Sequence, residues 1–471
     1  MQMKHYALVA ALVCSVVSNG LSQAKPGGVG RQIAMGGAYS GRNAVFNPFI
    51  FQDPAWVLIN PAYQHMYRDY VWLNVAGGGV TGANGGENVS GSQFGGLNVG
   101  FGKEWAFGAI LSYDPSYANS LLGAGGVLNS YVNTARPGRV NPASTGVPTG
   151  TLPPVDVFEA LASYHSGDLS LGFGLLYGWT NKDYTSTPAA PASATDAALR
   201  AHVFGLRAGV ILDLGSGSAV EGSAAARFDG ATDTYTISGT GAGTGTSEYT
   251  ASATEIQANL RGRFRVSNRV NFIPYGGVMT ISATPKEGSI LAGQVASTFT
   301  SKTSTFSYVL GAGAEYSTRT FYLAGGVSIA SGKAKTESSP GVPGSGTTTS
   351  SSTISGFPVF NLGGEWWWTE WLAGRAGYYR AFGNRNVKTE PPTGGTAIEG
   401  NLFSPSSVVG ISGYGPISDN SLVTLGLGLK FAGFALDATV SEEALRRGLG
   451  LLGSGDNINT FGYIDLSYCF E

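Results

Sequence analysis

Residues 169–180 (LSLGFGLLYGWT) and 254–266 (TEIQANLRGRFRV) carry the pattern that decides the fold. In both stretches apolar side chains alternate strictly with small or polar ones, and similar stretches recur from about residue 70 to residue 470. A period of two places successive side chains on opposite faces of a β-strand, one apolar and one polar. Because about ten tilted residues carry a strand across a bilayer, repetition around a closed sheet predicts an all-β fold, a transmembrane antiparallel β-barrel.

The composition agrees with a membrane barrel better than with a soluble β-sandwich. Charged residues make up 12% of the chain, against about 25% in soluble domains, and 72 of the 471 residues are glycine. The 28 basic and 30 acidic residues nearly balance, which gives no reason to expect nucleic acid as a partner.

Residues 1–24 have the features of a secretory signal peptide. Lys4 and His5 precede the apolar stretch 6–17, and residues 22–24 (SQA) suit a signal peptidase. The apolar stretch is too short to span a bilayer as a helix. We therefore expect a mature chain that starts at Lys25 and is integral to a Gram-negative outer membrane. Cys469 is then its one cysteine, so no internal disulfide is expected.

The alternating stretches are expected to form seven hairpins between an opening and a closing strand, which makes sixteen strands. Each hairpin has a short turn, while the connections between hairpins are long, and in bacterial barrels the short turns face the periplasm. An even number of strands places both termini on that side. The predicted turns are 102–103, 165–167, 215–218, 267–268, 317–319, the region of Thr369, and 432–433. The predicted long connections are 79–91, 114–155, 181–198, 230–251, 283–303, 332–355, 382–419 and 441–460.

Two kinds of long connection are expected. The tracts 238–252 and 335–355 are rich in Gly, Ser and Thr and cannot bury a core, so we expect them to be loops. The connections 114–155 and 382–419 carry apolar residues, which either pack on one another as a lid or form a surface that captures apolar ligands. The candidates for capture are Leu121, Leu122, Leu128, Leu402 and Phe403.

Residues 25–66 precede the strands and lack a sustained period. They are too apolar for a disordered linker, so we expect them to fold into the barrel as a plug, called the hatch below. The chain would then consist of a signal peptide (1–24), the hatch (25–66) and the barrel with long extracellular loops (67–471). Three motifs stand out in the hatch: Met35, Gly36 and Gly37; Asp53; and Asn60, Pro61 and Ala62.

These motifs, together with the alternating strands, resemble the FadL family of outer-membrane transporters for hydrophobic compounds, and equally the related barrels of the type IX secretion system. In that family the matching segments belong to an N-terminal hatch. The resemblance implies a barrel that passes small hydrophobic molecules, such as long-chain fatty acids or aromatic hydrocarbons, without an energy source. Its expected partners are outer-membrane lipid and a hydrophobic ligand. Family barrels have fourteen strands, so the expected number is fourteen to sixteen.

Two alternatives to a hatch-gated channel stay open. A barrel of this size is wide enough to act as a general porin. A barrel with long loops can also dock secreted or surface proteins, as the type IX relatives do.

Placing the apolar face outward puts charged side chains of both signs inside the barrel. Arg261, Arg263 and Arg265 lie in the periplasmic half of their strand, where the hatch would sit, and Glu255 lies further along the same face. They are candidates for contact with a ligand's carboxylate or with the hatch, since guanidinium groups bind carboxylates through two hydrogen bonds. The alternative is that the internal charges pair with one another. The other residues expected inside are Arg207, Asp213, Glu221, Arg227, Asp229, Glu315, Glu365, Arg375, Asp437 and Asp465.

Nothing in the sequence predicts an enzyme. The mature chain has three histidines, His65, His165 and His202, and no two share a spacing suited to a metal. No Gly-x-Ser-x-Gly motif occurs. We expect no catalytic residues, no metal site and no cofactor.

Overall fold

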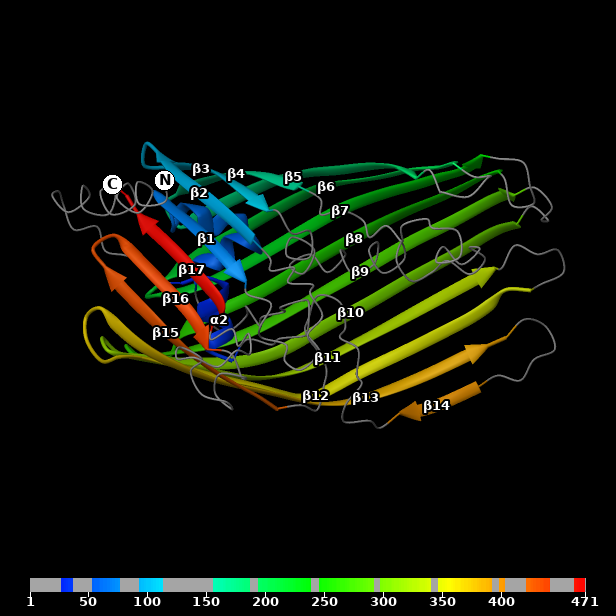
Figure 1. The fold of residues 1–471 in the computed structure, drawn as a ribbon. Coiled ribbons are helices and arrows are strands. Elements are labelled where there is room, and N and C mark those ends of the chain that lie inside the picture. The colour runs from blue at the N-terminus through cyan, green and yellow to red at the C-terminus, as the bar shows by residue number, and fades with distance from the viewer. Residues whose placement is uncertain are drawn as a thin grey trace, which may run out of the picture.

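The fold is a closed antiparallel β-barrel, seen in a computed structural model of the chain (Figure 1). The structure describes residues 27–36, 53–76, 93–112, 156–186, 194–238, 245–291, 297–339, 346–391, 398–402, 421–440 and 461–470. The strands of the ring are β1 (Tyr70–Ala76), β2 (Gln93–Phe101), β3 (Trp105–Ser112), β4 (Asp156–Ser166), β5 (Leu169–Ser186), β6 (Ala194–Gly215), β7 (Ser218–Ser238), β8 (Gly245–Arg265), β9 (Val270–Leu291), β10 (Ser297–Ser317), β11 (Phe321–Ser339), β12 (Thr348–Trp367), β13 (Leu372–Glu390), β15 (Ser421–Phe431), β16 (Phe434–Val440) and β17 (Phe461–Cys469).

The ring closes between its first and last strands. β1 pairs antiparallel with both β2 and β17, and every other strand of the ring pairs with its neighbours in sequence. The short strand β14 (Ile398–Leu402) pairs with the outer end of β13, whose inner part pairs with β15. Sixteen strands therefore make the wall, and the predicted fold class is confirmed.

Tight turns connect seven hairpins at one end of the barrel, where the sequence predicts them. Gly102 and Gly167 lie in two of these turns with φ of 63° and 57°, a region that glycine enters without strain. The hydrogen bond from the Thr318 amide to the carbonyl of Phe321, 2.8 Å, closes the turn between β10 and β11. The turns therefore fix the register of each hairpin from local sequence.

The opposite ends of the strands reach further than the sequence predicts. The prediction of loops is wrong over most of four connections, because strands β5 to β13 run through them. These connections are 181–198, 230–251, 283–303 and 332–355. Threonine and serine pair across these extensions, as in the 3.0 Å contact between the hydroxyls of Thr303 and Thr336. Threonine is β-branched and therefore favours strands. Paired strands of this kind can extend beyond the barrel's core without apolar side chains. In Figure 1 the strands β6 to β13 accordingly extend well past β1, β2, β16 and β17.

The outer face of the barrel is apolar, whereas the inner face carries buried charged side chains as well as apolar ones. Leu260 is 62% exposed, whereas its neighbour Arg261 is 4% exposed. Phe173, Trp179 and Leu310 repeat the pattern on other strands. An apolar outer surface around a closed barrel is the architecture of an integral outer-membrane protein.

None of the helices in the described part of the chain is both long enough and apolar enough to cross a membrane.

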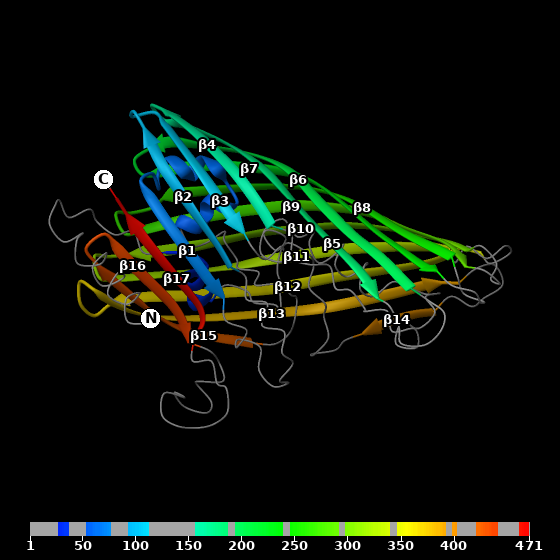
Figure 2. The ribbon, with the colours of Figure 1, turned by 45° about the horizontal axis from the view of Figure 1, so that its top comes forward.

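Three short helices of the hatch lie inside the barrel at the end with the tight turns (Figure 2). They are α2 (Val29–Ala34), η1 (Pro54–Leu58) and η2 (Pro61–His65). α2 contacts β13, β15, β16 and β17, and η2 contacts β3 to β6. The hatch is therefore held between two opposite parts of the wall.

Candidate functional site

The site is the interface between the hatch and the lumenal wall. Its two 3₁₀ helices begin at residues that cap them. Asp53 Oδ1 accepts a hydrogen bond from the Ala55 amide at 2.9 Å, and Asn60 Oδ1 accepts one from the Ala62 amide at 3.0 Å. Proline follows each capping residue, where its missing N–H costs nothing. The Asp-Pro and Asn-Pro-Ala motifs therefore act locally as helix-start signals.

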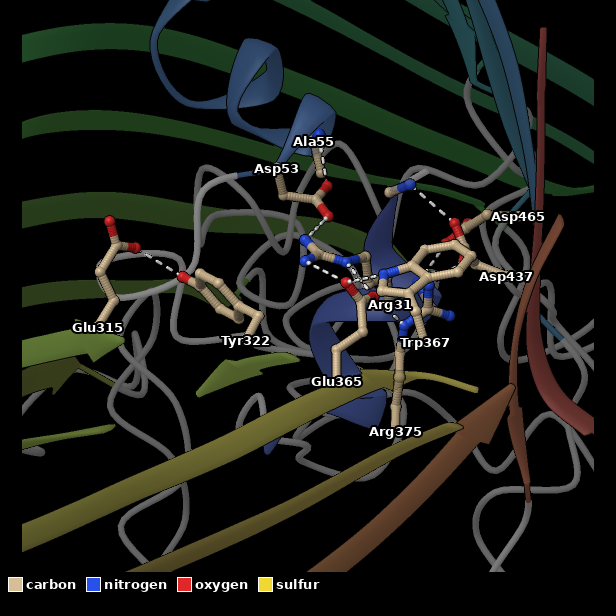
Figure 3. A network of polar contacts seen from close by, with 12 residues as sticks. Arg31, Asp53, Ala55, Glu315, Tyr322, Glu365, Trp367, Arg375, Asp437 and Asp465 are labelled. Atoms are coloured by element: carbon tan, nitrogen blue, oxygen red, sulfur yellow. Dashed lines mark hydrogen bonds and ion pairs between the residues drawn. The ribbon is translucent and has the colours of Figure 1, made fainter. Parts of the chain in front are cut away.

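Arg31 joins two segments of the hatch to each other and also binds the wall (Figure 3). Its guanidinium forms an ion pair with Asp53, at 3.0 Å from Nη1 to Oδ2, and a second with Glu365 of β12, at 2.9 Å from Nε to Oε2. All three side chains are buried. Because removing one member of a buried ion pair leaves an uncompensated charge, Arg31 contributes strongly to the position of the hatch.

The ion pairs continue along the wall behind α2. Arg375 of β13 lies 2.6 Å from Glu365 and 2.6 Å from Asp437 of β16. Asp437 in turn accepts the amide of Gly27 at 2.8 Å, and Asp465 of β17 accepts the amide of Gly30 at 2.6 Å. Four wall strands thus hold the start of the hatch through its backbone and through Arg31.

Arg261 of β8 holds the other part of the hatch. Its guanidinium carbon lies 3.6 Å from the centre of the Trp56 ring, a cation–π contact. It also donates to the Tyr63 hydroxyl and pairs with Glu221 of β7. The Tyr63 hydroxyl donates to Glu221 Oε1 at 3.0 Å, which completes a buried triangle of hatch and wall.

Glycines of the wall let the backbone of the hatch approach closely on the side of α2. A Cβ at Gly363 of β12 would collide with the Met35 carbonyl oxygen, and one at Gly377 of β13 would collide with the Gly36 amide. Gly36 itself has a φ of 86°, and the Asn361 side-chain amide donates to its carbonyl. The Met-Gly segment is therefore fitted to two glycines on neighbouring strands.

The same arrangement recurs on the side of η2. A Cβ at Gly172 of β5 would collide with the Ala62 amide, and one at Gly209 of β6 would collide with Asn60 Oδ1. The Asn60 side-chain amide also donates to the Val210 carbonyl at 3.3 Å. These wall glycines were not predicted from the sequence. The available signal was that each one occupies a lumenal position in an alternating strand.

The remaining arginines of β8 contact residues of the wall. Arg263 pairs with Glu315 of β10. Arg265 is exposed near the tight turns, where it donates to Asn268 Oδ1 at 2.9 Å. Asp213, which was expected inside, is exposed in the same region. Glu255 is buried further along β8, and neither of its carboxyl oxygens has a hydrogen-bond partner in the described part of the chain.

Of the candidates for ligand capture, Leu121, Leu122, Leu128 and Phe403 lie outside the described residues, as does Gly37 of the hatch motif. The remaining candidate, Leu402, is the last residue of β14 at the outer end of the barrel. Among the residues that the structure describes, no three His, Cys, Asp or Glu side chains are grouped so that they could hold a metal ion.

Two titratable groups of the hatch, Asp53 and His65, have pKa values shifted to between about 4 and about 6. Burial raises the pKa of Asp53 to about 6, against the opposing effect of Arg31. His65 stacks on His165 of β4 with ring centres 4.0 Å apart. Burial lowers the pKa of His65 to about 4, and the neighbouring His165 and Arg68 add to that effect.

No protein-family model matches the sequence, and no curated protein matches it either. Among solved structures, the barrel is similar to the Pseudomonas putida toluene transporter TodX, with 12% identity and a TM-score of 0.38 over 95% of this chain and 97% of that one. It is similar to a Pseudomonas aeruginosa FadL homologue at 12% identity and a TM-score of 0.37, over 95% and 100% of the two chains. It is also similar to the Yersinia pestis ferric yersiniabactin receptor FyuA, at 9% identity and a TM-score of 0.37, over 85% and 79%. These scores are too low to assign the chain a family or a ligand.

Proposed function

We propose that the protein is a passive outer-membrane channel for small hydrophobic molecules, gated by its hatch, with both termini in the periplasm. The observation that carries the proposal is the attachment of the hatch to two separate parts of the wall, through Arg31 to β12 and through Arg261 of β8. A segment held in this way would block the end of the barrel with the tight turns until its ion pairs rearrange. An open porin has no need of such a segment.

Apolar side chains on part of the inner wall support hydrophobic substrates. They include Ile273, Tyr275, Met279, Ile281 and Val309 of β9 and β10, and Ile273, Tyr275 and Val309 belong to a buried core that also contains Trp56 of the hatch. A water-filled porin lumen is lined with polar side chains instead. Apolar molecules would gain free energy on this surface in proportion to the area that they bury.

The test compares apolar and polar solutes. Cells that express the protein should take up radiolabelled 1-decanol faster than cells with an empty vector. Liposomes that contain the purified barrel should not swell in arabinose faster than protein-free liposomes. Rapid swelling in arabinose would identify a general porin, and unchanged decanol uptake would exclude the proposed transport.

A further inference from the structure

Among the residues that the structure describes, the lumen contains more buried carboxyl groups than buried arginines. Each buried arginine of the described chain already pairs with a carboxylate of the protein, as Arg207 does with Glu159 and Arg227 with Asp229. The buried arginines are Arg31, Arg207, Arg227, Arg261 and Arg375, and the buried acids are Asp53, Glu159, Glu221, Asp229, Glu255, Glu315, Glu365, Asp437 and Asp465. Even when the half-buried Arg263 is counted with its partner Glu315, acids exceed arginines by three among the described residues. A ligand's carboxylate would therefore enter a lumen with an excess of acidic groups.

Among these described acids, Glu255 is the one with both carboxyl oxygens lacking a hydrogen-bond partner in the described part of the chain. The residue is 1% exposed. Its neighbour across the ladder, Arg227 of β7, directs Nε to Asp229 at 2.7 Å and acts on Glu255 through its charge, without a hydrogen bond. Buried acceptors without donors cost free energy, so a donor that reached Glu255 would be bound favourably.

The side chains beside Glu255 on β9 are apolar and buried. Its neighbour on β9 is Ile281, and Met279 and Ala283 lie on the same face; each of these three residues is 1% exposed. Glu255 therefore lies where the polar inner faces of β7 and β8 meet the apolar inner face of β9. Such a border suits an amphiphile, with its chain on β9 and its polar group at the carboxyl.

Glu255 also lies on the route to the hatch. It shares the lumenal face of β8 with Arg261, which contacts Trp56 of the hatch. The two residues are six positions apart, about 20 Å along a strand, and Glu255 is the further from the tight turns. A molecule that entered from the outer end would meet Glu255 before it met the hatch.

We propose that Glu255 binds the polar group of the transported molecule, and that this group is an uncharged hydrogen-bond donor, an alcohol, and not a carboxylate. The inference rests on the proposed function as a channel for hydrophobic molecules and specifies its substrate class. A carboxyl group accepts hydrogen bonds in either protonation state, so a hydroxyl can donate to it at any pH. A carboxylate ligand would add one more negative charge to a lumen already short of cations.

The experiment is isothermal titration of the purified full-length barrel in detergent with three ten-carbon ligands. 1-Decanol donates a hydrogen bond, methyl nonyl ether only accepts one, and decanoate is an anion. We expect decanol to bind about tenfold more tightly than either of the others, as one hydrogen bond to a buried carboxyl group would give.

Two variants test the residue itself. Glu255→Met removes both acceptors with little change in volume, and it should abolish the preference for decanol while leaving the affinity for the ether unchanged. Glu248→Met changes an exposed residue of the same strand and should leave the preference intact. Equal affinities for decanol and the ether, tighter binding of decanoate, or a preference that survives Glu255→Met would overturn the inference alone. If the wild-type barrel bound none of the three ligands, the proposed function would fail together with it.

Discussion

Arg31 Nη1 lies 3.0 Å from Asp53 Oδ2 inside the barrel, so one guanidinium group joins two pieces of the hatch that are 22 residues apart. The same group reaches Glu365 of the wall. The hatch is therefore attached as a unit, and the loss of Arg31 affects its internal structure and its attachment together.

Replacing Arg31 should release the hatch without unfolding the barrel. Arg31→Ala leaves Asp53 buried without its ion-pair partner and leaves Glu365 with Arg375 alone, and breaking a buried pair costs about 3–5 kcal/mol. We expect channel openings in planar bilayers and new trypsin cleavage in the hatch, while the folded barrel keeps its anomalous migration on a detergent gel. Arg319→Ala is the control, since its pair with Glu370 is almost fully exposed and contributes little. Closed, protease-resistant Arg31→Ala protein would show that the ion pairs do not hold the hatch.

Adding one methyl group to the wall should have a similar effect. Gly363→Ala places a Cβ against the Met35 carbonyl, so the hatch must move away from β12. Its neighbour Gly364 has no atom closer than 3.5 Å to the same position, which makes Gly364→Ala a matched control on the same strand. We expect increased conductance for the first variant only. Equal conductance in the two variants would mean that the close approach at Gly363 is unimportant.

The two perturbed groups of the hatch should act in opposite directions between pH 4 and pH 6. The pKa of Asp53 is raised to about 6, so its contribution favours the docked hatch at low pH and is lost as the pH rises through 6. The pKa of His65 is lowered to about 4, so its contribution is present above pH 6.5 and is lost as the pH falls toward 4. Asp53→Asn should therefore leave a hatch that loosens steadily on acidification.

The measurement is trypsin cleavage of the docked hatch after incubation at each pH. Wild-type protein should change little between pH 6 and pH 4, because the two contributions offset each other. His65→Asn should show the reverse of Asp53→Asn, with a hatch that tightens on acidification. The same pH profile in both variants would contradict the assignment of these opposing effects.

Arginine is required at position 261 for its shape as well as its charge. Arg261→Lys keeps the positive charge but loses the planar contact with Trp56 and the shared geometry with Tyr63 and Glu221. We expect it to weaken the hatch by about 1–2 kcal/mol, measured as increased channel opening. Arg265→Lys, at an exposed position near the turns, should behave as the wild type. A silent Arg261→Lys channel would contradict the role of the stacked contact.

The wall could be predicted from sequence because its signals are local. Alternation identified each strand, and glycines such as Gly102 and Gly167 marked the turns. The outer ends of β7, β8, β11 and β12 could not be predicted, because Gly, Ser and Thr tracts are equally compatible with loops. Only cross-strand pairing, as between Thr303 and Thr336, decides between the two.

The hatch interface was less predictable, because its partners are distant in sequence. Arg31 and Glu365 are 334 residues apart, and no local pattern relates them. The acids and arginines of the lumen were predicted to face inward, but their pairing depends on the register of the closed ring. The wall glycines beneath Met35 and Ala62 were missed because strands rich in glycine gave no reason to select particular ones.

The most direct test of the central claim is single-channel conductance of the mature protein beside a variant that lacks residues 25–66. Both proteins should show the gel migration of a folded barrel. We expect the intact protein to be nearly silent and the variant to conduct steadily. Steady conductance of the intact protein, with little change on deletion, would contradict gating by the hatch and identify an open porin.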